Sequence, residues 1–228
     1  MRRQDTPSRK RMHGLSLVEL LVGVALGLFV AASAASLLAS HLRESRGLLL
    51  EARLMQELRT AADVVTRDLR RAGYWGAAAS GVWTSAGAGG VRANPYAAVS
   101  PSAAASDAVA FQFSRDAIEN HAIDNNEQFG FRLRAGTLEM QIGVANWQAL
   151  TDVTALTVTE FNVAPIVENV ELAGYCGRPC TGVACPHLEV RRLALRLAGR
   201  AVADTRVMRS LRSEVRVRND VVIGTCPT

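Results

Sequence analysis

The chain has 228 residues and a formal net charge of +5, and most of that charge lies at one end. Residues 1–14 carry five basic side chains against one acid, so the remainder is almost neutral and gives no strong argument for nucleic-acid binding. Lys10 is the only lysine, and no GxSxG, HExxH or P-loop motif occurs, so we expect no catalytic site and no cofactor.

The first predicted element is an apolar helix. From Leu20 to Leu42 the chain has no Asp, Glu, Lys or Arg, and a run of this length can cross a bilayer at ~1.5 Å per residue. The basic segment before it predicts a cytoplasmic N-terminus and export of the chain beyond the apolar run. Three interpretations are open: a signal peptide cleaved near Ala32-Ser33-Ala34, a plain single-pass anchor with Glu19 at the interface, or a helix that is retained after a leader is removed.

The string GLSLVEL, residues 14–20, supports the third interpretation. It resembles the class III signal of type IV prepilins, in which a short basic leader and a glycine precede an apolar helix with glutamate at its fifth position. The resemblance implies cleavage between Gly14 and Leu15, N-methylation of Leu15, and docking of Glu19 against the N-terminus of a neighbouring subunit. Glu19 lies four positions after Leu15, which places the carboxylate and the new amine on one helical face.

The helix is predicted to continue through residues 43–72. Apolar residues recur there at spacings of three and four, no proline interrupts residues 15–72, and Gly73 is placed to end the helix. The stripe predicts that this second half packs on a soluble domain.

The end of this helix carries a second resemblance. ARLMQELRTAADVVTRDLRRAGYWG, residues 52–76, is similar to the corresponding segment of the PilW family of minor pilins. The resemblance implies a non-catalytic subunit that helps to prime type IV pilus assembly. Its expected partners are prepilin peptidase, other minor pilins, the major pilin and a tip adhesin. Its expected location is the inner membrane, as a single-pass protein with a periplasmic domain, and then the pilus. A J-type pseudopilin of a type II secretion system has the same architecture and remains an alternative.

The rest of the chain predicts a β-rich domain. Residues 77–106 have the composition of a loop, and period-2 patterns predict strands over residues 108–114, 129–134, 137–142, 153–163, 188–197 and 213–218. Ala135-Gly136 predicts a hairpin turn. We therefore expect an α+β, pilin-like roll, with the long helix on an antiparallel sheet of about four to six strands. The expected segments are a leader (1–14), a membrane and assembly half-helix (15–42), an amphipathic half-helix (43–73) and a periplasmic domain (74–228).

Polar side chains in this domain give few candidate sites. Four arginines are expected on one side of their strands, as a solvated face or, less favoured, a binding surface: Arg192, Arg196, Arg216 and Arg218. His121 and residues 124–127 are expected in a solvated loop. The oxidising periplasm favours disulfides among Cys176, Cys180, Cys185 and Cys226, with three pairings open. The alternative is a metal site at Cys176, Cys180, Cys185 and His187, which would make the chain a membrane-anchored binding protein.

Overall fold

The computed structural model describes residues 16–81 and 92–227. Its one long helix, α1 (Leu17–Leu69), is followed by antiparallel strands. The chain separates into a unit that ends at Leu48 and a globular unit that begins at Leu49. The strands are β1 (Val99–Ser100), β2 (Ala108–Gln112), β3 (Gln128–Arg134), β4 (Thr137–Ile142), β5 (Trp147–Ala149), β6 (Leu156–Glu171), β7 (His187–Ala201), β8 (Met208–Arg216) and β9 (Val221–Ile223).

The end of α1 follows from a glycine. The helix stops at Leu69, three residues before the predicted end, and tighter turns continue to Gly73. Gly73 has φ 73°, a left-handed conformation in which a side chain would be strained. Its N–H donates a hydrogen bond to the carbonyl of Gln112 on β2, at 2.8 Å. The residue predicted to end the helix thus also fixes the helix end to a strand.

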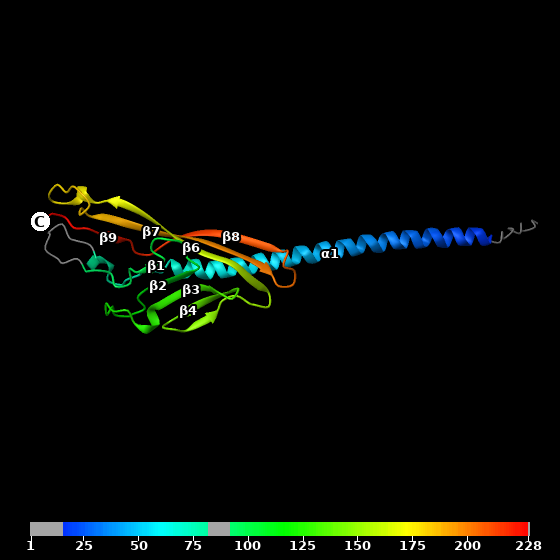
Figure 1. The fold of residues 1–228 in the computed structure, drawn as a ribbon, viewed down its shortest axis with the longest axis horizontal. Helices are drawn as coiled ribbons and strands as arrows, with labels where there is room; N and C mark the ends of the chain where they lie inside the picture. The colour runs from blue at the N-terminus through cyan, green and yellow to red at the C-terminus, as the bar shows by residue number, and fades with distance from the viewer. Residues whose placement is uncertain (1–15, 82–91, 228) are drawn as a thin grey trace, which may run out of the picture. The chain divides into compact units, whose positions relative to one another are not determined.

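The strands form two sheets, where a single sheet of about four to six strands was expected. One has the order β1-β2-β3-β4-β5, and in the other β7 lies between β6 and β8, with β9 also paired to β7. Figure 1 shows β7 and β8 along one side of the second part of α1 and β3 and β4 along the other. The fold class, a long helix packed on antiparallel β-structure, is confirmed.

Strand limits differ from the prediction where turns or long pairings intervene. β6 begins at Leu156 and not at Val153, because Asp152 accepts hydrogen bonds that close a turn over the residues between them. β6 then continues to Glu171 through Pro165, which pairs opposite Leu193. β8 begins earlier than predicted and ends at Arg216. β4 and the turn at Ala135-Gly136, whose two residues both have positive φ, agree with the prediction.

The core joins α1 to both sheets. The buried face of the helix contains Leu54, Leu58, Ala61, Ala62, Val65 and Leu69. A stack of phenylalanines faces it from the first sheet, and Leu193, Leu195 and Leu197 of β7 face it from the second. At Gly199 a Cβ would overlap Leu156 and lie 3.1 Å from the carbonyl oxygen of Thr157, so the missing Cβ permits close packing of β7 on β6. The predicted apolar stripe is therefore the centre of the domain.

We predict that Leu58→Ala lowers the free energy of unfolding by about 2–5 kcal/mol, because Leu58 is fully buried and its truncation leaves a cavity in the core. Urea unfolding of the full chain in detergent, followed by tryptophan fluorescence, measures this loss. Leu49→Ala on the same helix is the control, since Leu49 is exposed and its truncation should cost less than about 0.5 kcal/mol. Equal losses would show that the stripe is not the core.

Candidate functional site

The N-terminal part of α1 presents apolar side chains outward on every face. All the large hydrophobic residues from Leu17 to Leu42 are more than half exposed, and none lies in the core of the globular unit. Among the described residues α1 is the one helix that is long and apolar enough to cross a membrane. This surface has no partner within the described part of the chain, so it fits single-pass anchoring.

Glu19 lies in the first turn of this helix and is exposed. A carboxylate there interacts favourably with the positive end of the helix dipole, by about 0.3–1 kcal/mol. Gly23 and Gly27 occupy the next positions at four-residue spacing, so they share a face with Glu19, and no atom outside the helix backbone lies within 4 Å of the position where either would carry a Cβ. The predicted cleavage residues Gly14 and Leu15 lie outside the described residues.

A polar cluster that the sequence analysis missed holds the chain just after α1. The buried Trp75 donates a hydrogen bond from its indole N–H to Nδ1 of His121, at 3.2 Å. Glu119 accepts hydrogen bonds from Gly76 N–H, His121 N–H and the buried hydroxyl of Tyr96. His121 was expected in a solvated loop, and this is wrong: it anchors that loop to the helix exit. No periodic pattern marks such a contact between residues 46 positions apart.

Electrostatics support a structural role for this cluster. Burial raises the pKa of Glu119, but backbone hydrogen bonds from His121 and Gly76, together with those from side chains, outweigh it and hold the pKa below its ordinary value. Burial also raises the pKa of the Tyr96 hydroxyl. The carboxylate thus stays ionised and the phenol stays neutral, which suits a fixed hydrogen-bond network better than a proton-transfer site.

The neighbouring acidic segment is also structural. Glu127 is fully buried and accepts hydrogen bonds from the backbone N–H groups of Arg115 and Asp124, at 2.6 and 2.9 Å. Its carboxylate therefore ties the end of β2 to the loop before β3. The expectation of a solvated loop is wrong for this residue.

The four arginines singled out in the sequence separate into two groups. Arg192 pairs with Glu168 and Glu214, Arg196 pairs with Glu160, and Arg216 pairs with Asp220. All three extend from one sheet face: Arg192 and Arg196 form partly exposed ion pairs, whereas the Asp220 partner of Arg216 is mostly buried. Arg218 is different: it lies beyond β8, where its N–H donates to the carbonyl of Ala72 near the helix end.

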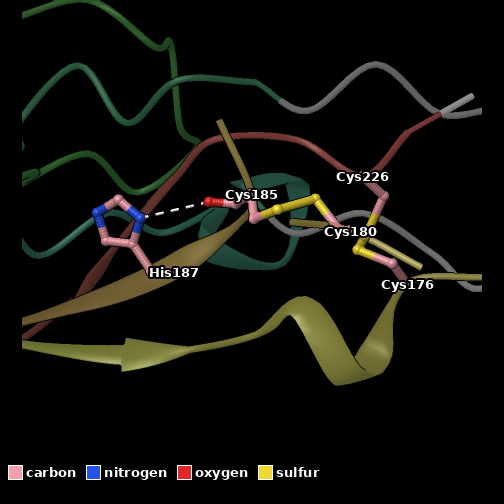
Figure 2. Close-up of a disulfide and its surroundings, with 5 residues drawn as sticks. All are labelled: Cys176, Cys180, Cys185, His187 and Cys226. Atoms are coloured by element: carbon pink, nitrogen blue, oxygen red, sulfur yellow. Dashed lines mark hydrogen bonds between the residues drawn. A yellow bond between two sulfur atoms is a disulfide. The ribbon is translucent and has the colours of Figure 1, made fainter. Parts of the chain in front are cut away.

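The cysteines form two disulfides, Cys176–Cys226 and Cys180–Cys185 (Figure 2). The first joins the segment after β6 to the chain end after β9, and the second closes a short loop before β7. His187 lies near Cys185, with Nδ1 3.4 Å from its carbonyl oxygen. No cysteine is left as a free thiol, and the described residues contain no His/Cys/Asp/Glu group that could hold a metal ion. The disulfides use all three sulfur atoms that the alternative metal site would require, so this arrangement leaves His187 as the one remaining ligand of that set.

An apolar N-terminal helix whose second part packs on antiparallel sheets defines a pilin-like α+β protein. A family model described as Prepilin peptidase-dependent protein B matches residues 47–217, and the chain belongs to this family. The curated proteins and the solved structures contain no match. The family match begins beyond Glu19, so it is independent of the N-terminal signal. The match supports a pilin-related structural protein, but it does not identify the chain as a member of the PilW family.

We predict that the two disulfides differ in their contribution to stability. In the chain-entropy model, removing the bridge of sequence separation 50 with Cys176→Ser and Cys226→Ser costs about 4 kcal/mol. Removing the bridge of separation 5 with Cys180→Ser and Cys185→Ser costs about 2 kcal/mol. Urea unfolding compares the two, and peptide mapping without reductant identifies the linked cysteines. Linked peptides with any other pairing would contradict this assignment.

Proposed function

We propose that the chain is a PilW-like minor pilin, a non-catalytic structural subunit that primes or takes part in type IV pilus assembly. In this proposal residues 1–14 are a leader, residues 15–42 insert in the membrane and later in the filament, and residues 43–73 join that half-helix to the periplasmic domain, residues 74–228. The partners are prepilin peptidase, other minor pilins and the major pilin, with a position at the pilus tip beside an adhesin. The protein starts in the inner membrane and ends in the pilus.

One observation carries the proposal. The exposed apolar part of α1 has Glu19 in its first turn, within a stretch that resembles a prepilin signal. The globular part of the same chain belongs to a family named for dependence on prepilin peptidase. An ordinary membrane anchor would not require a glycine and a glutamate at these two positions.

Charge pairing gives Glu19 a physical role in assembly. A carboxylate at the centre of a bilayer costs about 2.5–3.5 kcal/mol and less toward its edge, whereas an opposite charge at 4 Å returns about 4 kcal/mol at an effective dielectric constant of 20. Cleavage creates a suitable charge, the α-amino group of Leu15, and methylation leaves it positive. Pairing between Glu19 of one subunit and Leu15 of the next then offsets the cost and sets their register. The adjacent Gly23 and Gly27 allow close approach of a neighbouring helix.

We predict that the mature chain begins at Leu15. The intact mass of protein purified from membranes should correspond to residues 15–228, with one added methyl group on the N-terminal amine. Gly14→Leu is the matched variant and should retain residues 1–14, because prepilin peptidase would not cleave it. A chain that begins near Ala35 would instead identify an ordinary signal peptide and overturn the proposal.

We predict that Glu19→Ala is cleaved and inserted normally but enters filaments at least tenfold less efficiently, because the N-terminus of its neighbour loses its charge partner. Immunoblots of sheared surface filaments and of membranes measure the ratio. Glu44→Ala, which removes an exposed carboxylate elsewhere on α1, should assemble normally. Normal assembly of Glu19→Ala would contradict the docking role. If the wild-type chain stays in the periplasm and is absent from surface pili, the result would favour the pseudopilin alternative.

A further inference from the structure

A cationic pocket lies where α1 ends in the globular unit. Its volume is about 390 Å³, and it is lined by three arginines, two aromatic residues and a serine: Arg70, Arg71, Arg218, Tyr74, Phe113 and Ser114. No carboxylate is among the lining residues. The family match and the pilin resemblance assign no role to this pocket.

Aromatic rings lie beside two of the guanidinium groups, closely for Arg71 and at the outer limit of a cation–π contact for Arg218. The Cζ atom of Arg71 lies 4.0 Å from the ring centroid of Phe113, and Cζ of Arg218 lies 6.0 Å from that of Tyr74. Phe113 is itself fixed by a parallel stack on Phe129, with centroids 4.1 Å apart. Such cation–π contacts use the faces of the guanidinium planes and leave their N–H edges available to a ligand.

Two of these arginines have no carboxylate partner among the described residues, in contrast to Arg192, Arg196 and Arg216 on the sheet. Among the residues that the structure describes, neither Arg70 nor Arg218 forms an ion pair, and Arg71 has a single contact of 3.9 Å with Asp68. Asp68 is also paired with Arg67, at 3.3 Å. The positive charge of the pocket is therefore only partly neutralised, because its one acidic contact, Asp68, also pairs with Arg67. The chain as a whole is almost neutral beyond its first segment.

Helix stabilisation accounts for only part of this arrangement. Cations in the last turn of a helix interact favourably with its dipole, by about 0.3–1 kcal/mol, which suits Arg70 and Arg71. Arg218 comes from a distant part of the sequence and is positioned by its backbone hydrogen bond to Ala72, at 3.1 Å. The fold thus adds a third cation and two rings to a helix end that needs neither.

We propose that this pocket binds a multivalent oxyanion, of the carboxylate or phosphate class. Guanidinium groups donate paired hydrogen bonds that match the geometry of both anions, and charge-assisted bonds of this kind are the strongest ones available to a side chain. The rings of Tyr74 and Phe113 give the site an apolar wall. The inference does not depend on the proposed function, since it concerns the globular unit alone.

Calorimetric titration of the full chain in an uncharged detergent tests the proposal, with pyrophosphate as the phosphate probe and citrate as the carboxylate probe. Ionic strength is held constant and low, because salt screens exposed charges. We expect saturable binding at one site by at least one probe, and the probe that binds more tightly identifies the source of the anion. Absence of saturable binding by both would overturn the proposal.

Charge-reversal variants locate the site. Arg70→Glu and Arg218→Glu should each weaken binding at least tenfold, and Arg218→Glu keeps the backbone bond that positions this segment. The control is Arg212→Glu on β8, an exposed arginine with no ion pair among the described residues, which makes the same change in net charge. It should alter affinity less than threefold. If Arg212→Glu weakens binding as much as Arg218→Glu, while all variants keep the wild-type melting temperature, the interaction is non-specific and the proposal fails.

Discussion

One face of α1 is buried in the core that the helix shares with the two sheets, and its buried residues include Leu54, Leu58, Val65 and Leu69. The remainder of the globular unit is arranged around this contact. Each sheet has an apolar face that it cannot bury by itself, and the helix satisfies both. The end of the helix is also held in place, by hydrogen bonds to Gly73. The carbonyl of Gly73 accepts hydrogen bonds from Asn94 and Asn219, at 2.9 and 3.0 Å, while its N–H donates to Gln112. Three distant segments therefore meet at one residue, which explains why the polar cluster and the cationic pocket both lie at this end of the helix.

The sequence predicted those parts of the fold that depend on local periodicity. The helical stripe, Gly73 and the hairpin at Ala135-Gly136 are each determined by spacing or by a turn residue, and the structure agrees with them. The division into two sheets was not predictable in this way, because strand partners depend on contacts far apart in sequence. The length of β6 was missed for a related reason. The alternating pattern predicted a strand only as far as Val163, but continuous pairing with β7 extends β6 to Glu171. Very short strands such as β1 and β9 contain too few residues to show any period.

The candidate sites divide in the same way: a contiguous motif could be predicted from the sequence, whereas contacts between distant residues could not. The stretch that resembles a prepilin signal is contiguous, so roles for Gly14, Leu15 and Glu19 could be proposed from the sequence alone, and they remain a proposal. The disulfide pairing could not be chosen from four cysteines, since it depends on the approach of the chain end to the segment after β6. The roles of His121 and Glu127 were misjudged because polar residues in a polar stretch resemble a solvated loop. Only the folded chain shows that Trp75 donates a hydrogen bond to His121 and that two backbone N–H groups donate to Glu127.

The positions of the charged residues in this molecule are more informative than its net charge. Beyond the first segment the positive and negative residues nearly balance, yet the outer sheet face and the helix end use their arginines differently. On the sheet, Arg192 and Arg196 face glutamates across neighbouring strands, so their charges are neutralised where they stand. At the helix end, Arg70 and Arg218 line one pocket with two aromatic residues, and neither forms an ion pair within the described part of the chain. Exposed ion pairs contribute little to stability, so the sheet arginines mainly keep an open face soluble. An arginine without an acid partner gives up no ion pair when it binds an anion, and this difference is the physical basis for proposing a binding site at the helix end.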